Sequence, residues 1–182
     1  MSVLAVIPAR GGSKRLPRKN LQPFRGRPLL SWTVAEARRS KLITTLVLST
    51  EDDEIARMGR ALGVQILYRP ESLATDEARS EDVMRHALKC FPGHEWVVLL
   101  QPTSPLRLAY DIDRCVEMAQ AHEIAVSYSE SVTRNGAVYV AEADWLRQGG
   151  HFLDPIPKAS QYVMPTSRSL DIDTQEDLEC QS

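Results

Sequence analysis

Residues 3–14 read VLAVIPARGGSK, and the rest of the fold can be inferred outward from them. Val3–Pro8 is a continuous apolar run that is too short for a helix and typical of a buried strand. A loop with two glycines and two basic residues follows at once, from Ala9 to Lys14. We therefore expect a buried first strand that ends in a polar loop, the opening unit of an α/β protein.

The rest of the chain alternates in the same way between short apolar runs and stretches with helical periodicity. Strands are expected at residues 42–49, 64–68, 95–100, 124–128 and 137–140, and helices at residues 28–40, 51–62, 80–90, 110–121 and 173–180. This alternation predicts a single three-layer α/β/α domain over residues 1–182, with a mainly parallel sheet.

Four polar segments each follow an expected strand directly: PARGGSK, STEDD, YRPE and LLQPTSP. In open α/β sheets, ligands bind outside the carboxyl ends of the strands. We therefore expect these four loops to meet on one rim of the sheet and to form a ligand site there.

The composition excludes several classes of protein. Of 182 residues, 43% are hydrophobic and 25% are charged, which is ordinary for a globular chain and argues against disorder. The net charge of -2 argues against a nucleic-acid or membrane partner bound through overall charge. No apolar run could span a bilayer, no signal peptide is recognisable and the three cysteines lie far apart, so we expect a cytoplasmic protein with free thiols.

The charges are unevenly distributed along the chain. Seven basic residues lie between Arg10 and Arg27, ahead of the first acidic residue, Glu36. The segment from Asp171 to Ser182 has five acidic residues and no lysine or arginine. The two segments could pair with each other through salt bridges, or they could converge on a polyanion and its metal ion.

The basic loop carries the first candidate site. Gly11 and Gly12 permit close backbone approach and positive φ, so successive N–H groups can form a nest for an anion. Arg10, Lys14 and Lys19 supply positive charge. The loop lacks the spacing of a Walker A loop and of the GxGxxG dinucleotide fingerprint. The plainer alternative is a βα turn with a basic surface.

Two acidic segments require different interpretations. On a strand, Asp171 and Asp173 would point to the same face and could bind one Mg²⁺, although an N-cap aspartate beside a solvated acid is the simpler alternative. The run from Glu51 to Glu54 is better explained as charge in the first turn of a helix capped by Thr50, and no catalysis is assigned to it.

No histidines have metal-ligand spacing, and no serine or cysteine lies in a hydrolytic-triad motif.

Six segments, in this order, resemble the acylneuraminate cytidylyltransferases, which are the CMP-sialic acid synthetases and their relatives. They are IPARGGSKRLPRKNL, LSTEDDEIA, RPESLATDEARSEDVMRHAL, LLQPTSPLR, NGAVYV and LDIDTQEDLE. The resemblance implies a Rossmann-like nucleotidyltransferase fold and a reaction in which CTP and a nonulosonic (sialic-type) acid give the CMP-sugar and pyrophosphate. Such transfers depend mostly on positioning and charge stabilisation, which agrees with the absence of a nucleophile motif.

The resemblance also implies roles for individual residues. Arg10 and Lys19 would be catalytic, because they would neutralise charge on the leaving pyrophosphate. The nucleotide-binding positions would be Ala9, Arg10, Ser13, Lys19, Asn20, Arg69, Ala78 and Ser80. The sugar-binding positions would be Gln101, Tyr139 and Phe152, and Asp171 and Asp173 would bind Mg²⁺.

One segment departs from the family pattern. Family members usually carry a longer stretch between the strand near Val126 and NGAVYV, including an arm that exchanges between subunits and completes the neighbour's sugar site. Only SYSESVTR lies there in this chain. We expect a chain break between Ser127 and Asn135, with arm residues missing from the sequence, and a homodimer. The alternative is a true deletion, in which CTP binding would survive while sugar activation falls.

Two other functions stay open. A related cytidylyltransferase for the eight-carbon sugar acid Kdo is disfavoured by the QPTSPLR and NGAVYV segments. A nucleotide-binding module without turnover would bind CTP and release no pyrophosphate.

Overall fold

The structure is a computed structural model that describes residues 1–131, 133–152 and 159–179. The strands of its central sheet are β1 (Val3–Pro8), β4 (Thr45–Thr50), β5 (Gln65–Tyr68), β6 (Trp96–Leu99), β7 (Ile124–Ser129), β8 (Arg134–Glu142) and β9 (Ala159–Met164). The helices are α1 (Leu29–Arg39), α2 (Asp53–Ala61), α3 (Ser80–Cys90), α4 (Ala109–His122), α5 (Ala143–Arg147) and α6 (Gln175–Glu179). The short elements are β2 (Pro23–Phe24), β3 (Arg27–Pro28), η1 (Lys19–Leu21), η2 (Glu71–Leu73) and η3 (Thr166–Arg168).

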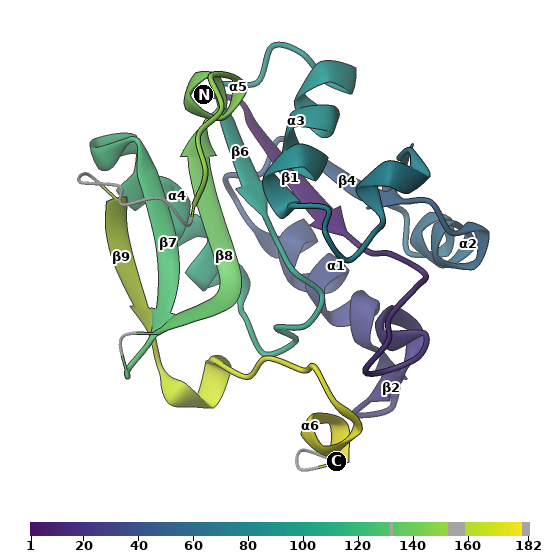
Figure 1. Ribbon diagram of the computed structural model, residues 1–182. Helices are drawn as coiled ribbons and strands as arrows, with labels where there is room; N and C mark the ends of the chain where they lie inside the picture. The colour runs from purple at the N-terminus through teal and green to yellow at the C-terminus, as the bar shows by residue number, and fades with distance from the viewer. Residues whose placement is uncertain (132, 153–158, 180–182) are drawn as a thin grey trace.

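The sheet is mainly parallel, as expected from the sequence, and has the order β5-β4-β1-β6-β8-β7-β9 (Figure 1). β1 pairs in parallel with β4 and β6, while β8 runs antiparallel to its neighbours β6 and β7. The chain leaves β1 toward β4 and β5 and then returns to β6 on the other side of β1. The loops after β1 and β6 therefore flank the point at which the strand order reverses, where open α/β sheets bind ligands.

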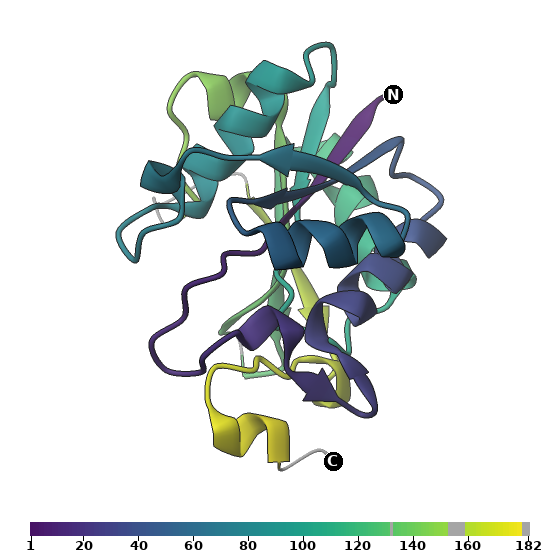
Figure 2. The ribbon, with the colours of Figure 1, turned by 90° about the vertical axis from the view of Figure 1, so that its right-hand side faces the viewer.

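Helices cover both faces of the sheet, which confirms the three-layer architecture (Figures 1 and 2). On one face, α1, α2 and α4 bury Leu30, Ile55 and Ile112 against the strands. On the other face, α3 and α5 bury Met84 and Leu146. Both cores are aliphatic, and removal of this apolar surface from water is the main stabilising contribution to such a fold.

The C-terminal segment folds back onto the segment that follows β1, as Figures 1 and 2 both show. A small third core joins Leu16, Phe24 and Leu29 to Ile172 and Leu178. This core places the acidic end of the chain beside the basic loop.

The residues around Asp171 differ from the sequence-based expectation. They form no strand, because the Ile172 N–H donates to the Thr103 carbonyl oxygen at 2.8 Å outside any sheet. The last helix begins at Gln175 and not at Asp173, and Cys180 lies outside the described residues.

The chain break expected between Ser127 and Asn135 stays a prediction, and the described residues on either side of it pair directly. β7 and β8 are antiparallel neighbours, with Tyr128 opposite Arg134. The Ser129 N–H donates to the Thr133 carbonyl oxygen at 2.8 Å, so the backbone pairing extends to these two residues.

Three further elements differ from expectation. α2 is capped by Asp52 and not by Thr50, because the Asp52 carboxylate accepts the N–H groups of Glu54 and Ile55 while Thr50 ends β4. α5 and β9 were not expected at all, since α5 is too short to show periodicity and β9 (ASQYVM) has polar residues at its second and third positions. Among the described residues, no helix has the length and apolar character needed to cross a membrane.

Candidate active site

A cavity of about 250 Å³ opens at the carboxyl ends of the parallel strands. The loops after β1, β5 and β6 and the start of α3 form its wall. The predicted site residues that line it are Arg10, Lys19, Asn20, Arg69, Ala78, Ser80 and Gln101. Three of the four loops expected on this rim, those after β1, β5 and β6, therefore line one cavity, whereas no residue of STEDD does.

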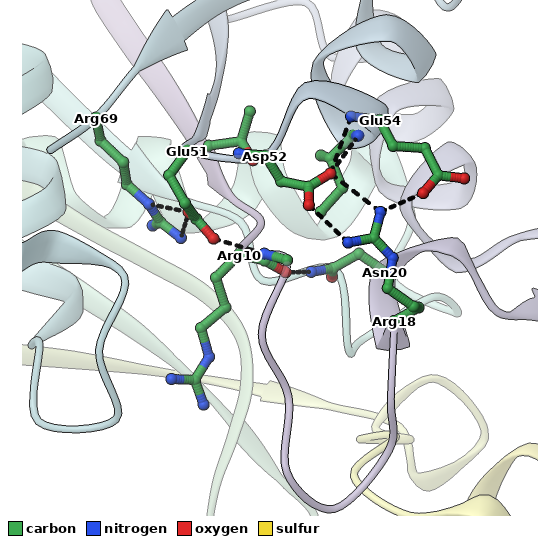
Figure 3. A network of polar contacts seen from close by, with 10 residues as sticks. Arg10, Arg18, Asn20, Glu51, Asp52, Glu54 and Arg69 are labelled. Carbon is green, nitrogen blue, oxygen red and sulfur yellow. Dashed lines mark hydrogen bonds and ion pairs between the residues drawn. The ribbon is translucent and has the colours of Figure 1, made fainter. Parts of the chain in front are cut away.

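The backbone of the basic loop is held in place by side chains. The Asn20 side chain donates to the Arg10 carbonyl oxygen at 2.9 Å, and the Gly11 N–H donates to Glu51 Oε1 at 2.7 Å (Figure 3). A Cβ at Gly11 would lie 2.4 Å from Asp52 Oδ2, so only glycine permits this approach. Neither Gly11 nor Gly12 uses the positive φ that glycine permits. The Gly11 N–H does bind an anion, but that anion is a carboxylate of the protein.

Glu51 also binds Arg69, and the sequence analysis did not assign it to the site. Arg69 Nε donates to Glu51 Oε2 at 3.0 Å, and Figure 3 shows Glu51 between Arg69 and the loop of Arg10. Burial lowers the pKa of Arg69 from its ordinary value, and the Glu51 carboxylate opposes that shift. Glu51 precedes the first turn of α2. Its carboxylate binds Arg69 and the Gly11 N–H, and it lies outside the turn in which a negative charge interacts with the helix dipole. The position of Glu51 directly after a strand was the available signal.

The cations of the basic loop are paired with carboxylates in this structure. Arg10 and Lys14 bind Asp76 at 2.7 and 2.6 Å, and Lys19 binds Asp173 at 2.9 Å. The sequence left two interpretations open: salt bridges between the acidic and basic segments, or convergence of both on a polyanion and its metal ion. They are compatible, because the acidic segment pairs with the basic loop at the rim where a polyanion would bind. A polyphosphate that binds here would exchange these carboxylates for phosphate oxygens.

Asp171 and Asp173 lie in different electrostatic environments. Desolvation by the surrounding protein raises the pKa of Asp171, although the residue as a whole is exposed to solvent. A hydrogen bond from Thr103 opposes this shift, and the charge of Asp173 adds to it. At Asp173 burial also favours the protonated form, but hydrogen bonds and charge from Lys19 and Arg15 outweigh it, so the pKa falls below its ordinary value.

The donor chemistry of this pair fits a hard cation. Two carboxylates suit Mg²⁺, which takes one or two from the protein and fills its other positions with phosphate oxygens and water. Within the described ranges, no group of three or more histidine, cysteine or acidic residues could hold a metal alone. A metal at Asp171 and Asp173 would therefore need oxygen ligands from a substrate or solvent.

A second cavity, of about 380 Å³, adjoins the first, because Ser80 and Gln101 line both. Tyr139 and Phe152, two of the predicted sugar-binding residues, lie in its wall with their ring centroids 5.1 Å apart. Tyr139 is placed by the register of the sheet, opposite Leu99 on β6. Aromatic rings beside polar groups form a surface suited to a sugar ring.

Gly136 brings this cavity close to the acidic pair. Its φ is +73°, and a Cβ there would lie 2.7 Å from Gln101 Oε1 and 3.7 Å from Asp171 Oδ2. The glycine of the NGAVYV segment is thus required both by its conformation and by the close approach.

Two predicted nucleotide-binding residues line neither cavity. The Ala9 side chain is fully buried in the core, and the Ala9 N–H donates to the Ser49 carbonyl oxygen at 2.9 Å. Ser13 lies on the basic loop outside the walls of both cavities.

Arg107 is a buried cation that the sequence analysis did not single out. It is 1% exposed and donates to the carbonyl oxygens of Gln101 and Ala137 at 3.2 and 2.6 Å, and to the Thr33 hydroxyl at 2.7 Å. Burial lowers its pKa to about 10. By joining the loop after β6 to β8 and α1, Arg107 positions Gln101 between the two cavities.

A cation-lined cavity at the carboxyl ends of parallel strands, adjoining a ring-lined cavity, is the arrangement of a nucleotidyltransferase. Sequence comparison makes the class more specific. The chain belongs to the cytidylyltransferase family, which it matches over residues 4–144.

Two relatives give the scale of the similarity. The chain is 30% identical to an N-acylneuraminate cytidylyltransferase of Escherichia coli O18:K1:H7 over 213 residues, which cover 97% of this chain and 50% of that protein. It is 29% identical to a pseudaminic acid cytidylyltransferase of Campylobacter jejuni over 221 residues, which cover 98% and 94%. The chain thus spans half the length of the first relative. Both alignments exceed its 182 residues, so the relatives contain insertions that this chain lacks.

Solved structures show the same fold. A CMP:2-keto-3-deoxy-manno-octonic acid synthetase complexed with CTP has a TM-score of 0.81 at 15% identity and covers 99% of this chain and 96% of its own. A protein of Mycobacterium tuberculosis H37Rv in complex with manganese has a TM-score of 0.72 at 18% identity and covers 99% and 97%.

Proposed function

We propose that this protein transfers the CMP group of CTP to the anomeric hydroxyl of a nonulosonic acid and releases pyrophosphate. The observation that carries the proposal is the pair of cavities that meet at Ser80 and Gln101. A nucleotide in the cation-lined cavity would present its α-phosphate to a sugar in the ring-lined cavity. Membership of the cytidylyltransferase family and the two named relatives support the choice of CTP and of a sialic-type acid.

The reaction needs no protein nucleophile. The sugar hydroxyl oxygen attacks the α-phosphorus in line, gives its proton to solvent, and forms a P–O bond while the bond to pyrophosphate breaks. Arg10 and Lys19 would stabilise the negative charge that develops on the leaving pyrophosphate. Asn20, which holds the Arg10 carbonyl, and Arg107, which holds Gln101, would position the reactants.

Asp171 and Asp173 would hold a divalent metal, which we propose to be Mg²⁺. When bound, the ion would neutralise charge on the phosphates. The manganese complex of the mycobacterial protein with the same fold supports a divalent ion. The chain's own contribution is to release Asp173 from Lys19 and Arg15 when the triphosphate binds those cations.

Nucleotide selectivity tests the proposal. With Mg²⁺ present, titration calorimetry should show tighter binding of CTP than of ATP, GTP or UTP. Equal affinity for all four nucleotides would leave only a generic phosphate site and would overturn the cytidine assignment.

Turnover separates the remaining functions. Pyrophosphate release is measured with CTP and each of three acids: N-acetylneuraminic acid, pseudaminic acid and 2-keto-3-deoxy-manno-octonic acid. Release with either of the first two supports the proposal, and release with the third alone supports the Kdo-type enzyme. CTP binding without release from any acid would support a nucleotide-binding module.

We also propose a homodimer located in the cytoplasm, on the basis of the family resemblance. In the family that it resembles, the arm that exchanges between subunits lies ahead of NGAVYV, where this sequence has only SYSESVTR. Light scattering at several protein concentrations gives the mass of the particle in solution. A mass of one chain at all concentrations would refute the dimer.

A further inference from the structure

A buried carboxylate lies in the wall of the second cavity. Glu81, the second residue of α3, is 7% exposed and lines the cavity together with Tyr139. Its Oε1 accepts a hydrogen bond from the Phe152 N–H at 2.9 Å, which fixes the side chain. A glutamate in the first turn of a helix normally serves the helix dipole from solvent, so burial in a cavity needs another explanation.

Glu81 has acceptor capacity that the protein does not use. An ionised carboxylate has about four acceptor positions. Within the described part of the chain, no lysine or arginine forms an ion pair with Glu81. Its carboxylate accepts a hydrogen bond from the Phe152 N–H. A second unsatisfied group lies in the same wall, because Nδ1 of His151 is buried without a partner among the described residues. Buried polar atoms of this kind are normally satisfied by a ligand or by water.

The charge of Glu81 restricts what can face it. A 2-keto sugar acid carries its own carboxylate, and two carboxylates in contact repel each other strongly in a cavity of low dielectric constant. The substrate group that faces Glu81 must therefore be a hydrogen-bond donor, either a hydroxyl or an amide N–H. Arg79, which lines the same cavity, is the cation available to the substrate carboxylate.

We propose that Glu81 is a specificity-determining residue of the sugar-acid site. Its carboxylate accepts a hydrogen bond from a hydroxyl or amide N–H of the bound sugar acid. It also repels the substrate carboxylate, so the sugar acid binds with that carboxylate facing Arg79. This inference rests on the proposed function, since it takes the occupant of the second cavity to be a sugar acid.

The variant Glu81→Gln tests it. The glutamine oxygen can still accept the Phe152 N–H, but the amide group presents donors where the substrate needs an acceptor. Binding of N-acetylneuraminic acid and pseudaminic acid is measured by titration calorimetry in the presence of CMP, so the readout does not require turnover. Since hydrogen bonds to charged groups are the stronger kind, the Kd and the sugar KM should rise about tenfold. The KM for CTP should stay the same.

The matched control is Glu77→Gln, which removes an exposed carboxylate four residues earlier that lines neither cavity. It should leave sugar binding unchanged. CTP titration and thermal melting establish that each variant is folded, and Glu81→Asp, which keeps the charge on a shorter side chain, replaces Glu81→Gln if the latter does not fold. Unchanged sugar affinity in a folded Glu81 variant, or an equal loss for CTP, would overturn the inference. Absence of pyrophosphate release from the wild-type protein would instead count against the proposed function alone.

Discussion

At the scale of single residues, two lysines of the basic loop differ sharply in environment. The Lys19 side chain is 18% exposed and lines the first cavity, whereas the Lys14 side chain is 86% exposed. We predict that Lys19→Ala lowers kcat far more than Lys14→Ala does. Loss of a preorganised charge at a reacting phosphate costs on the order of 2.7–4 kcal/mol, or at least about 10²-fold.

Steady-state rates of the two variants, measured at saturating CTP, provide the test. Similar losses in both would mean that the loop acts only as a diffuse basic surface.

Glu51 is the second residue whose environment leads to a prediction. It is the counter-charge of the buried Arg69 and holds the Gly11 N–H. Removing one partner of a buried ion pair strands the other charge, so Glu51→Gln should lower the free energy of unfolding by about 3 kcal/mol. Urea denaturation measures this loss.

Glu54→Gln is the control, because the Glu54 side chain is 60% exposed. The double variant Glu51→Gln with Arg69→Met should recover part of the stability, since no charge is then left unpaired. A double variant that is less stable than Glu51→Gln alone would contradict this account.

At the scale of elements, the start of α2 joins helix capping to the basic loop. Asp52 caps the helix through two backbone N–H groups, and Arg18 donates to both of its oxygens, at 2.6 and 3.1 Å. The hydrogen bond from Arg18 is the main cause that lowers the pKa of Asp52 below its ordinary 3.8. The charged form is therefore favoured by folding, and its stabilisation is present above pH 3.8 and lost as the pH falls through the lowered pKa.

We predict that Asp52→Asn lowers the free energy of unfolding by about 1 kcal/mol at pH 7, because asparagine retains the cap but not the ion pair. The difference from the wild type should shrink as the pH falls below 3.8. Thermal melts across this range test it, with Asp144→Asn as a surface control. If the difference in stability between the wild type and Asp52→Asn grew toward low pH, the ion pair would not be its cause.

At the scale of the whole molecule, the two ends of the chain meet in one site. Lys19 and Asp173 are 154 residues apart in sequence and 2.9 Å apart in space. We predict that Asp171→Asn and Asp173→Asn each lower turnover by about 10²-fold or more, because a shared metal site loses affinity with each carboxylate. Raising the Mg²⁺ concentration should restore part of the rate.

Glu176→Gln is the matched control, since Glu176 is an exposed acid on α6 of the same segment. Comparable small effects in all three variants would favour a solvated acidic tail. Glu51→Gln would be an unsuitable control, because Glu51 binds Arg69 within the site.

Local pattern was enough to predict much of the architecture. β1 and α3 have the predicted limits, because a short apolar run and a clear helical period each report burial within one segment. The order of strands and loops then brought Arg10 and Arg69 to one rim, since the carboxyl ends of parallel strands share an edge.

The tertiary structure was needed wherever a residue's partner lies far away in the chain. Sequence position made Glu51 a helix-dipole acid, but the fold made it the partner of Arg69. The contact between Glu81 and the Phe152 N–H spans 71 residues. β7 and β8 are neighbours because their backbones pair across the sheet, which no single-segment pattern could establish. Periodicity reports how one segment is buried, whereas the identity of a side chain's partner depends on how distant segments pack.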